Sequence, residues 1–115
     1  MGIDRKQILI SFLDVINDVS NKEYQKRVWI EGNGPECDDF DETTCYFFDM
    51  GDPILDDYKN FGITDEQYNI LVKFRDEFEK FSRTHDLPQE FINSPEWEKI
   101  MKMAKEVLDA FNYNK

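Results

Sequence analysis

Carboxylates are the most abundant groups in this sequence that could do chemistry. Two pairs, Asp38–Asp39 and Asp56–Asp57, are adjacent. General acid–base catalysis would require one member of a pair to lie in an apolar pocket that raises its pKa. Adjacent residues on a helix point in different directions, so adjacency does not bring the two carboxylates together. The pairs therefore do not by themselves indicate an enzyme.

Metal-binding patterns are missing from the sequence as well. A calcium loop needs acids at alternating positions, a central glycine and a glutamate at the twelfth position, and no window has that arrangement. The chain has two cysteines, Cys37 and Cys45, and one histidine, His85, far from both in sequence. This set falls short of a zinc site and gives little support to Cys–His catalysis. We expect no metal, no cofactor and no catalytic residue.

The acids are concentrated in one stretch, from Glu31 to Tyr58. The chain has 25 acids and 14 bases, for a net charge of -11. This stretch holds ten of the acids and no Lys, Arg or His, which leaves 15 acids and 14 bases in the rest of the chain. A surface of one sign attracts partners of the other sign. The sequence therefore predicts an interaction protein that presents this segment to a basic partner.

The candidate contact residues are most of these acids and the aromatic side chains beside them. They are Glu36, Asp38, Asp39, Asp41, Glu42, Tyr46, Asp49, Asp56, Asp57 and Trp29. A solvated acidic face is usually only a solubility feature, but here aromatic residues interrupt the acids, as at protein interfaces. Trp29 has two interpretations, a core residue or an anchor beside the acidic segment.

Charge and length narrow the class of protein. A strongly negative chain repels nucleic acid and anionic membranes, and no apolar run approaches the ~20 residues that span a bilayer. The first residues lack the pattern of a secretory signal, so we expect a cytoplasmic protein with two reduced thiols, although a Cys37–Cys45 bridge is sterically possible. The length of 115 residues suits a single domain, residues 1–115.

Three longer helices are predicted from apolar spacing and capping residues. The first runs from about Asp4 to Val19, with Asp4 as its N-cap. The second, Asp65–Thr84, follows a capping box formed by Thr64 and Gln67 and carries a phenylalanine stripe expected to be core. The third begins at Pro95 after the capping residue Ser94 and extends to about Asn112. Residues 86–89 are predicted to connect the last two helices.

Shorter helices are expected between the first and second of these. Ser20 and Asn21 can each cap a helix from Lys22 to about Ile30, and Ser20 has capping-box spacing with Glu23. A short strand from Arg27 to Ile30 is the alternative. A loop follows at residues 32–35. Residues 38–48 then form a helix that Gly51 ends, and Asp52 and Pro53 start another. The sum is an all-α bundle of three longer helices with two or three short helices in the acidic middle segment.

Two segments resemble small bacterial immunity proteins. They are Gly34–Thr43 (GPECDDFDET) and Phe61–Tyr68 (FGITDEQY). The Pro95-Glu96-Trp97 opening of the last helix adds to the likeness. The proteins it resembles are encoded beside the toxins of contact-dependent growth inhibition and related polymorphic toxin systems. The resemblance implies a cytoplasmic protein, not an enzyme, that binds and neutralises one cognate toxin domain.

Many toxins of such systems are nucleases, whose basic substrate grooves suit an acidic inhibitor, and we expect the inhibitor to be a monomer or weak dimer. Two alternatives stay open. An acidic protein can mimic nucleic acid and occupy a DNA- or RNA-binding protein, although charges clustered in one segment suit this less well than charges spread along a surface. The acids could also belong to a small metal-binding enzyme or regulator, which titration with calcium, magnesium and manganese would test.

Overall fold

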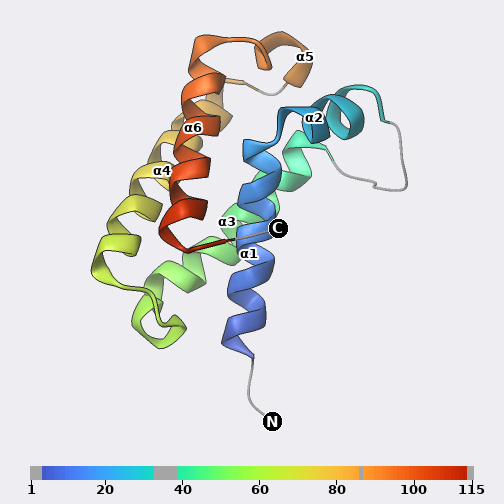
Figure 1. The fold of residues 1–115 in the computed structure, drawn as a ribbon. Coiled ribbons are helices and arrows are strands. Elements are labelled where there is room, and N and C mark those ends of the chain that lie inside the picture. The colour runs from blue at the N-terminus through green and yellow to red at the C-terminus, as the bar shows by residue number, and fades with distance from the viewer. Residues whose placement is uncertain (1–3, 33–38, 86, 114–115) are drawn as a thin grey trace.

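The computed structural model describes residues 4–32, 39–85 and 87–113, and every regular element in these ranges is helical (Figure 1). The elements in chain order are α1 (Arg5–Ser20), α2 (Lys22–Tyr24), the π-helical η1 (Gln25–Ile30), α3 (Phe40–Asp56), the 3-10 helix η2 (Tyr58–Phe61), α4 (Asp65–Thr84), α5 (Pro88–Phe91) and α6 (Pro95–Ala110). The all-α prediction is confirmed, and residues 22–30 are helical rather than extended.

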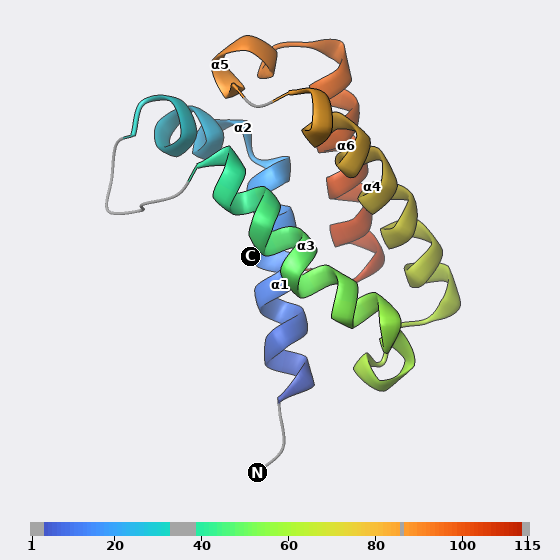
Figure 2. The same cartoon turned by 180° about the vertical axis from the view of Figure 1, so that it is seen from behind.

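The four longest described helices form the body of the molecule. Helix α6 lies between α1 and α4 and packs against both of them. Helix α3 crosses the opposite side of the molecule, where it packs against α1 and, at fewer positions, against α4 (Figure 2). The Cα radius of gyration is 14.0 Å, close to the value of about 13 Å expected for a compact chain of this length.

Local sequence determines where the long helices begin. The Asp4 carboxylate accepts a hydrogen bond from the Gln7 backbone N–H at 3.2 Å. Thr64 and Gln67 form the full capping box, in which each side chain accepts a hydrogen bond from the other residue's backbone N–H. The Ser94 hydroxyl caps α6 by accepting a hydrogen bond from the Trp97 backbone N–H at 3.2 Å. These bonds satisfy amide groups that have no partner within the helix.

Three predicted boundaries are wrong by a few residues. Ser20 does not cap α2; it is the last residue of α1, and its hydroxyl donates to the Asn17 carbonyl at 2.8 Å. Asn21, equally suited to capping, does so by accepting from the Tyr24 amide. The connection after α4 contains the short helix α5, which starts at Pro88, and α6 ends at Ala110 rather than near Asn112.

The acidic segment differs from the prediction, because residues 40–56 form one helix of 17 residues. Gly51 does not end it and Asp52 does not cap a new one. A Cβ atom at Gly51 would lie 2.9 Å from Cε1 of Phe12, so glycine allows α3 to approach α1 closely. Pro53 removes one backbone hydrogen bond from the helix. Packing on both sides of these residues, by Phe47 and Ile54, outweighs their low helix propensity.

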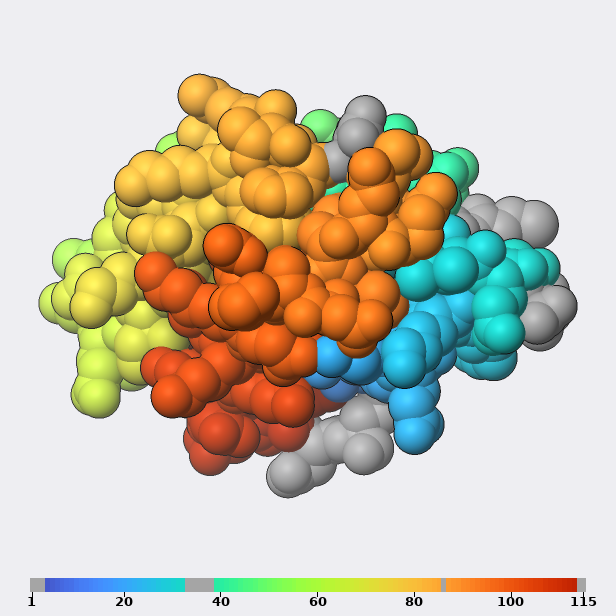
Figure 3. Space-filling view, turned by 90° about the horizontal axis from the view of Figure 1, so that it is seen from above, coloured from blue at the N-terminus to red at the C-terminus, as the bar shows by residue number. Residues whose placement is uncertain are grey.

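Aromatic side chains fill one end of the core around Trp97, which is fully buried. The rings in contact with it come from η1, α3, α4 and α5; they are Trp29, Phe40, Phe78, Phe81 and Phe91. Above them, α5 and η1 pack side by side and close this end of the molecule (Figure 3). The predicted phenylalanine stripe of α4 is therefore core.

A single buried amide joins three helices at this end. The Gln25 side chain is 0% exposed. Its Nε2 donates to the carbonyls of Asp18 and Val19, at 3.0 and 2.8 Å, and its Oε1 accepts from Nε1 of Trp97 at 2.8 Å. Because every strong hydrogen-bonding group of the amide is satisfied, the network holds η1 against α1 and α6 rather than destabilising the core.

Candidate partner-binding surface

Helix α3 buries one face and presents acids on the other. Its buried residues recur at helical spacing and are Phe40, Thr43, Phe47, Gly51 and Ile54. The acids that lie within the helix are all exposed and define what we call the acidic face: Asp41, Glu42, Asp49, Asp52 and Asp56. Glu42, Asp49 and Asp56 are seven residues apart, about two turns, so they form a straight row along the helix.

One member of the acidic face has a basic partner within the described residues. Asp52 pairs with Arg75 of α4, with 3.0 Å between Oδ1 and Nε. The hydrogen bond that Arg75 donates to the Asp52 carboxylate raises the pKa of Arg75 above its ordinary value. Arg75 also lies 5.3 Å above the ring of Phe48 and pairs with Glu79. In the described part of the chain, no ion pair joins a base to Asp41, Glu42, Asp49 or Asp56.

The position of each acid along the helix determines its effect on stability. Asp39 caps α3 by accepting from the Glu42 amide at 2.8 Å. Asp41 and Glu42 lie in the first turn, where negative charge interacts favourably with the helix dipole. Asp56 and Asp57 lie at the other end, where the dipole disfavours acids. Asp57 accepts a hydrogen bond from the Asn60 side chain at 2.6 Å, whereas no described residue donates such a bond to the Asp56 carboxylate.

Tyr46 is the large apolar side chain that stands out on this helix. It is 53% exposed, although α3 otherwise buries its aromatic rings wholly or in part. It lies between Glu42 and Asp49 along the helix, four and three residues away. Tyrosines in such positions combine a large apolar ring with a hydroxyl and are enriched at interfaces. Tyr46 and the acidic face therefore lie together on the exposed side of α3.

Other predicted contact residues are placed differently. Trp29 is 8% exposed and packs against Tyr24, Phe40 and Trp97, so the anchor interpretation is wrong and the core interpretation holds. The ring was ambiguous in sequence because its partners come from distant elements. Glu36 and Asp38 lie outside the described residues, as do Cys37 and most of the predicted loop; Gly32, at its start, has a φ of 67°.

His85 and Cys45, the described residues considered for metal binding or Cys–His chemistry, lie on separate elements: His85 follows α4 and Cys45 lies within α3. No three His, Cys, Asp or Glu side chains of the described ranges gather into a metal-binding group. His85 stacks on Phe81, with 4.0 Å between ring centroids, and its Nδ1 lies 3.0 Å from the Phe81 carbonyl. The imidazole therefore packs on the core at the C-terminus of α4. Cys45 is exposed on α3. None of the described helices combines the length and apolarity needed to cross a bilayer.

An apolar hollow that no sequence pattern indicates lies next to the acidic face, between the N-terminal half of α1 and the C-terminal half of α3. Its volume is about 400 Å³. Its apolar lining comes from three separate elements and consists of Ile8, Met50, Pro53, Ile54 and Phe61. Residues so far apart in sequence give no local pattern, so only the packing of α1 on α3 could reveal them.

The chain has no match among protein-family models, curated proteins or solved structures. Its own geometry defines a helical protein with one outer face of a single charge sign.

Proposed function

We propose that this chain is a binding protein that neutralises a basic partner protein through the acidic face of α3. The observation that carries the proposal is the segregation of charge. Of the acidic face together with Asp39 and Asp57, only Asp52 forms an ion pair with a base of the described residues, Arg75. Elsewhere acids and bases are nearly balanced in number.

The position of Asp56 adds an independent argument. An acid at the end of a helix, four residues from another acid, lowers the stability of that helix by a few tenths of a kcal/mol to about 1 kcal/mol. Neither the core nor the helix needs this charge. A residue that lowers stability without a structural return suits a surface whose role is binding.

The geometry suggests how such a protein would bind. The row from Glu42 to Asp56 spans about 21 Å, enough to face a substantial part of a basic groove. Long-range attraction raises the rate of association, and the desolvated ring of Tyr46 slows dissociation. Partners that lack a basic surface bind less well, because the acids would then be buried without counter-charges.

The resemblance to immunity proteins makes this proposal specific. The partner is then the toxin domain of a delivered effector, with a nuclease as the best-suited class because its substrate groove is basic. The chain would act in the cytoplasm, where such a toxin reaches its substrate, and it would need no cofactor. Occupation of the groove by α3 would exclude the substrate.

Nucleic-acid mimicry is the second candidate, and one observation favours it more than the sequence did. The acids form a row on a single long helix instead of a cluster on two short ones. The four acids without a described base are spaced at about one per 6 Å along α3, compared with one phosphate per about 3.4 Å along a strand. Because the charge density along α3 is lower than that of a nucleic-acid strand, we rank nucleic-acid mimicry below toxin inhibition.

A charge-reversal experiment tests the proposed function. The partner used is the toxin domain of a secreted effector encoded beside this chain. The test variant changes Asp41, Glu42, Asp49 and Asp56 to Lys. The control changes four exposed acids elsewhere, Glu90, Glu96, Glu106 and Asp109, to Lys, so both variants gain the same charge.

The test variant should lose protection against the co-expressed toxin, and its Kd should rise about 30- to 1,000-fold, since four rim charges contribute about 2–4 kcal/mol together. Its affinity should also become less sensitive to salt, whereas the control keeps most of its affinity. Equal losses of affinity in both variants would mean that net charge, rather than the position of the acids on α3, controls binding. Binding of a general host nucleoprotein in place of the toxin would support mimicry.

A further inference from the structure

The hollow between α1 and α3 differs in chemistry from the other hollows of the described surface. One of nearly equal volume, 420 Å³, lies on α4 and α6 and is lined mainly by alternating bases and acids such as Lys73, Glu77 and Lys102. Volume therefore does not distinguish the two. What distinguishes the α1–α3 hollow is an apolar floor with charged residues only at its edge.

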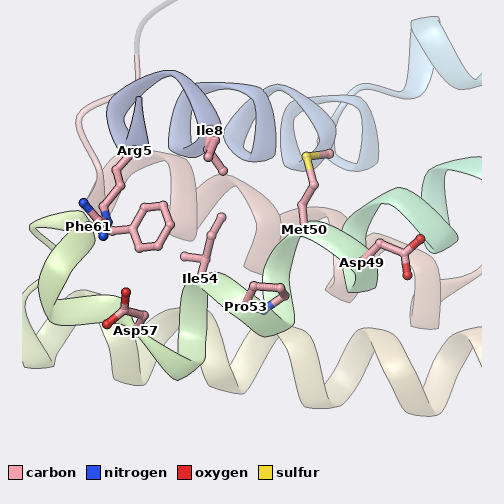
Figure 4. A pocket seen from close by; sticks show the side chains of 8 residues that line it. All are labelled: Arg5, Ile8, Asp49, Met50, Pro53, Ile54, Asp57 and Phe61. Carbon is pink, nitrogen blue, oxygen red and sulfur yellow. The ribbon is translucent and has the colours of Figure 1, made fainter. Parts of the chain in front are cut away.

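The floor is made of side chains that converge from both helices. Ile8 of α1 and Ile54 of α3 point towards one another, Met50 of α3 extends towards α1 beside them, and the Phe61 ring closes one end (Figure 4). Ile54 is fully buried, while Ile8, Met50 and Phe61 are only partly covered. An apolar side chain entering here would remove their remaining surface from water, at about 25 cal/mol per Å².

The rim continues the acidic face. Asp49 and Asp57 lie at opposite ends of the hollow (Figure 4), and Asp49 also belongs to the row that runs along α3. The two positions are about 12 Å apart along the helix. Arg5, the base on this rim, makes no ion pair with a described residue, so its guanidinium can donate hydrogen bonds to a carbonyl or carboxylate oxygen of a partner.

We propose that this hollow is the anchor pocket of the acidic face, and that it receives one large apolar side chain of a protein partner, flanked on both sides by Lys or Arg. The inference rests on the proposed function, since it names the part of the basic partner that α3 recognises. The flanking bases reach Asp49 and Asp57, while the apolar side chain covers Ile8, Met50 and Phe61. In an extended segment the two bases lie four residues apart, which spans about 13 Å.

Short synthetic peptides test this chemistry on the full chain. The probe is acetyl-Lys-Ser-Phe-Ser-Lys-amide. One comparison peptide replaces Phe by Ser, and another replaces both Lys by Glu. Binding is followed by the NMR signals of ¹³C-labelled Ile and Met methyl groups. Ile8, Met50 and Ile54 report on the hollow, and Ile70, on α4 beside a different hollow, reports on non-specific contact.

The probe should shift the three reporter methyls and leave Ile70 unchanged. Both comparison peptides should have a Kd at least about tenfold higher. Ile8→Lys should abolish the preference for Phe over Ser, whereas the matched variant Ile70→Lys should keep it. Because the peptide comparison uses the unmodified chain, it decides the question even if Ile8→Lys does not fold.

Each other outcome overturns the pocket in a different way. Equal binding of the Phe and Ser peptides along α3, with the hollow methyls unmoved, would remove the pocket and leave the proposed electrostatic function standing. Equal binding of the Glu-flanked peptide would show an apolar site without the inferred charge selection. Methyl shifts that depend on protein concentration alone would show that a second copy of this chain, and not a basic peptide, occupies the hollow. No shift with any peptide would count against the pocket and the attraction of basic segments together.

Discussion

Helices α3 and α6 have nearly the same length, 17 and 16 residues, and each packs one face into the core. Their outer faces differ. The exposed surface of α6 mixes both signs, with Lys99, Lys102 and Lys105 among its acids, and Lys99 pairs with Glu77 of α4 at 3.7 Å. The outer face of α3 has acids only. Since α6 shows that a helix of this fold can mix signs, the single-sign face of α3 is not required for folding.

The largest effects should come from the inner faces, where the two helices are alike. Phe47→Ala in α3 and Trp97→Ala in α6 each remove a fully buried aromatic ring. Each should lower the free energy of unfolding by about 3–5 kcal/mol, as measured by urea denaturation. A loss below about 1 kcal/mol for Phe47→Ala alone would contradict the packing of α3, and the inner faces of the two helices would no longer be alike.

Gly51→Ala should have the next largest effect, because it tests why α3 is continuous. The new methyl group would overlap the buried ring of Phe12, and such overpacking costs about 1–3 kcal/mol, while alanine returns about 1 kcal/mol of helix propensity. We expect a net loss of about 1 kcal/mol. The double variant with Phe12→Leu should show positive coupling in a double-mutant cycle; additive losses would mean that the two residues do not meet.

Removing the base that faces α3 would sharpen the contrast between the helices. Arg75→Gln breaks the pair with Asp52 and the contact with Phe48, and it should lower stability by about 1 kcal/mol. It also makes the acidic face more negative, so association with a basic partner should become faster at low salt. Lys99→Gln, which removes an exposed pair on α6, is the control and should change stability by at most a few tenths of a kcal/mol.

The smallest predicted change in stability comes from the repulsion between neighbouring acids on α3. Asp56 and Asp109 both lie in the last turn of a helix, but Asp52 precedes Asp56 by four residues and Lys105 precedes Asp109 by four. Asp56→Lys should therefore raise stability by about 0.5–1 kcal/mol, whereas Asp109→Lys should change it little. The difference should shrink as salt is added. Equal gains at both positions would show that the helix dipole alone is responsible.

Local patterns in the sequence predict most of the helices because the signals that start them span only four residues. The capping box of Thr64 and Gln67 and the Ser94–Pro95 pair need no tertiary information. Asn21 and Ser20 cap equally well on local grounds, so the choice between them falls to packing. Gly51 was misjudged because its use depends on Phe12, a residue of another helix.

The candidate surface was predicted in part. Charge counting alone identified the acids of α3 and the aromatic residue beside them, Tyr46. It could not distinguish the exposed Tyr46 from the buried Trp29, because burial depends on rings contributed by α3 and α6. The apolar hollow depends on the packing of α1 on α3, which places Ile8 beside residues of α3 and which no local sequence pattern encodes.

The two tryptophans have a consequence for optical measurements. The ring centroids of Trp29 and Trp97 lie 6.1 Å apart, and the indole N–H of Trp97 donates a hydrogen bond to the buried amide of Gln25. Both rings sit where η1 and α5 close the core, whereas the hollow lies near the N-terminal half of α1. Intrinsic fluorescence will therefore follow the unfolding of this chain and remain silent when a tryptophan-free ligand occupies the α1–α3 hollow, so one sample can report stability and binding through separate signals.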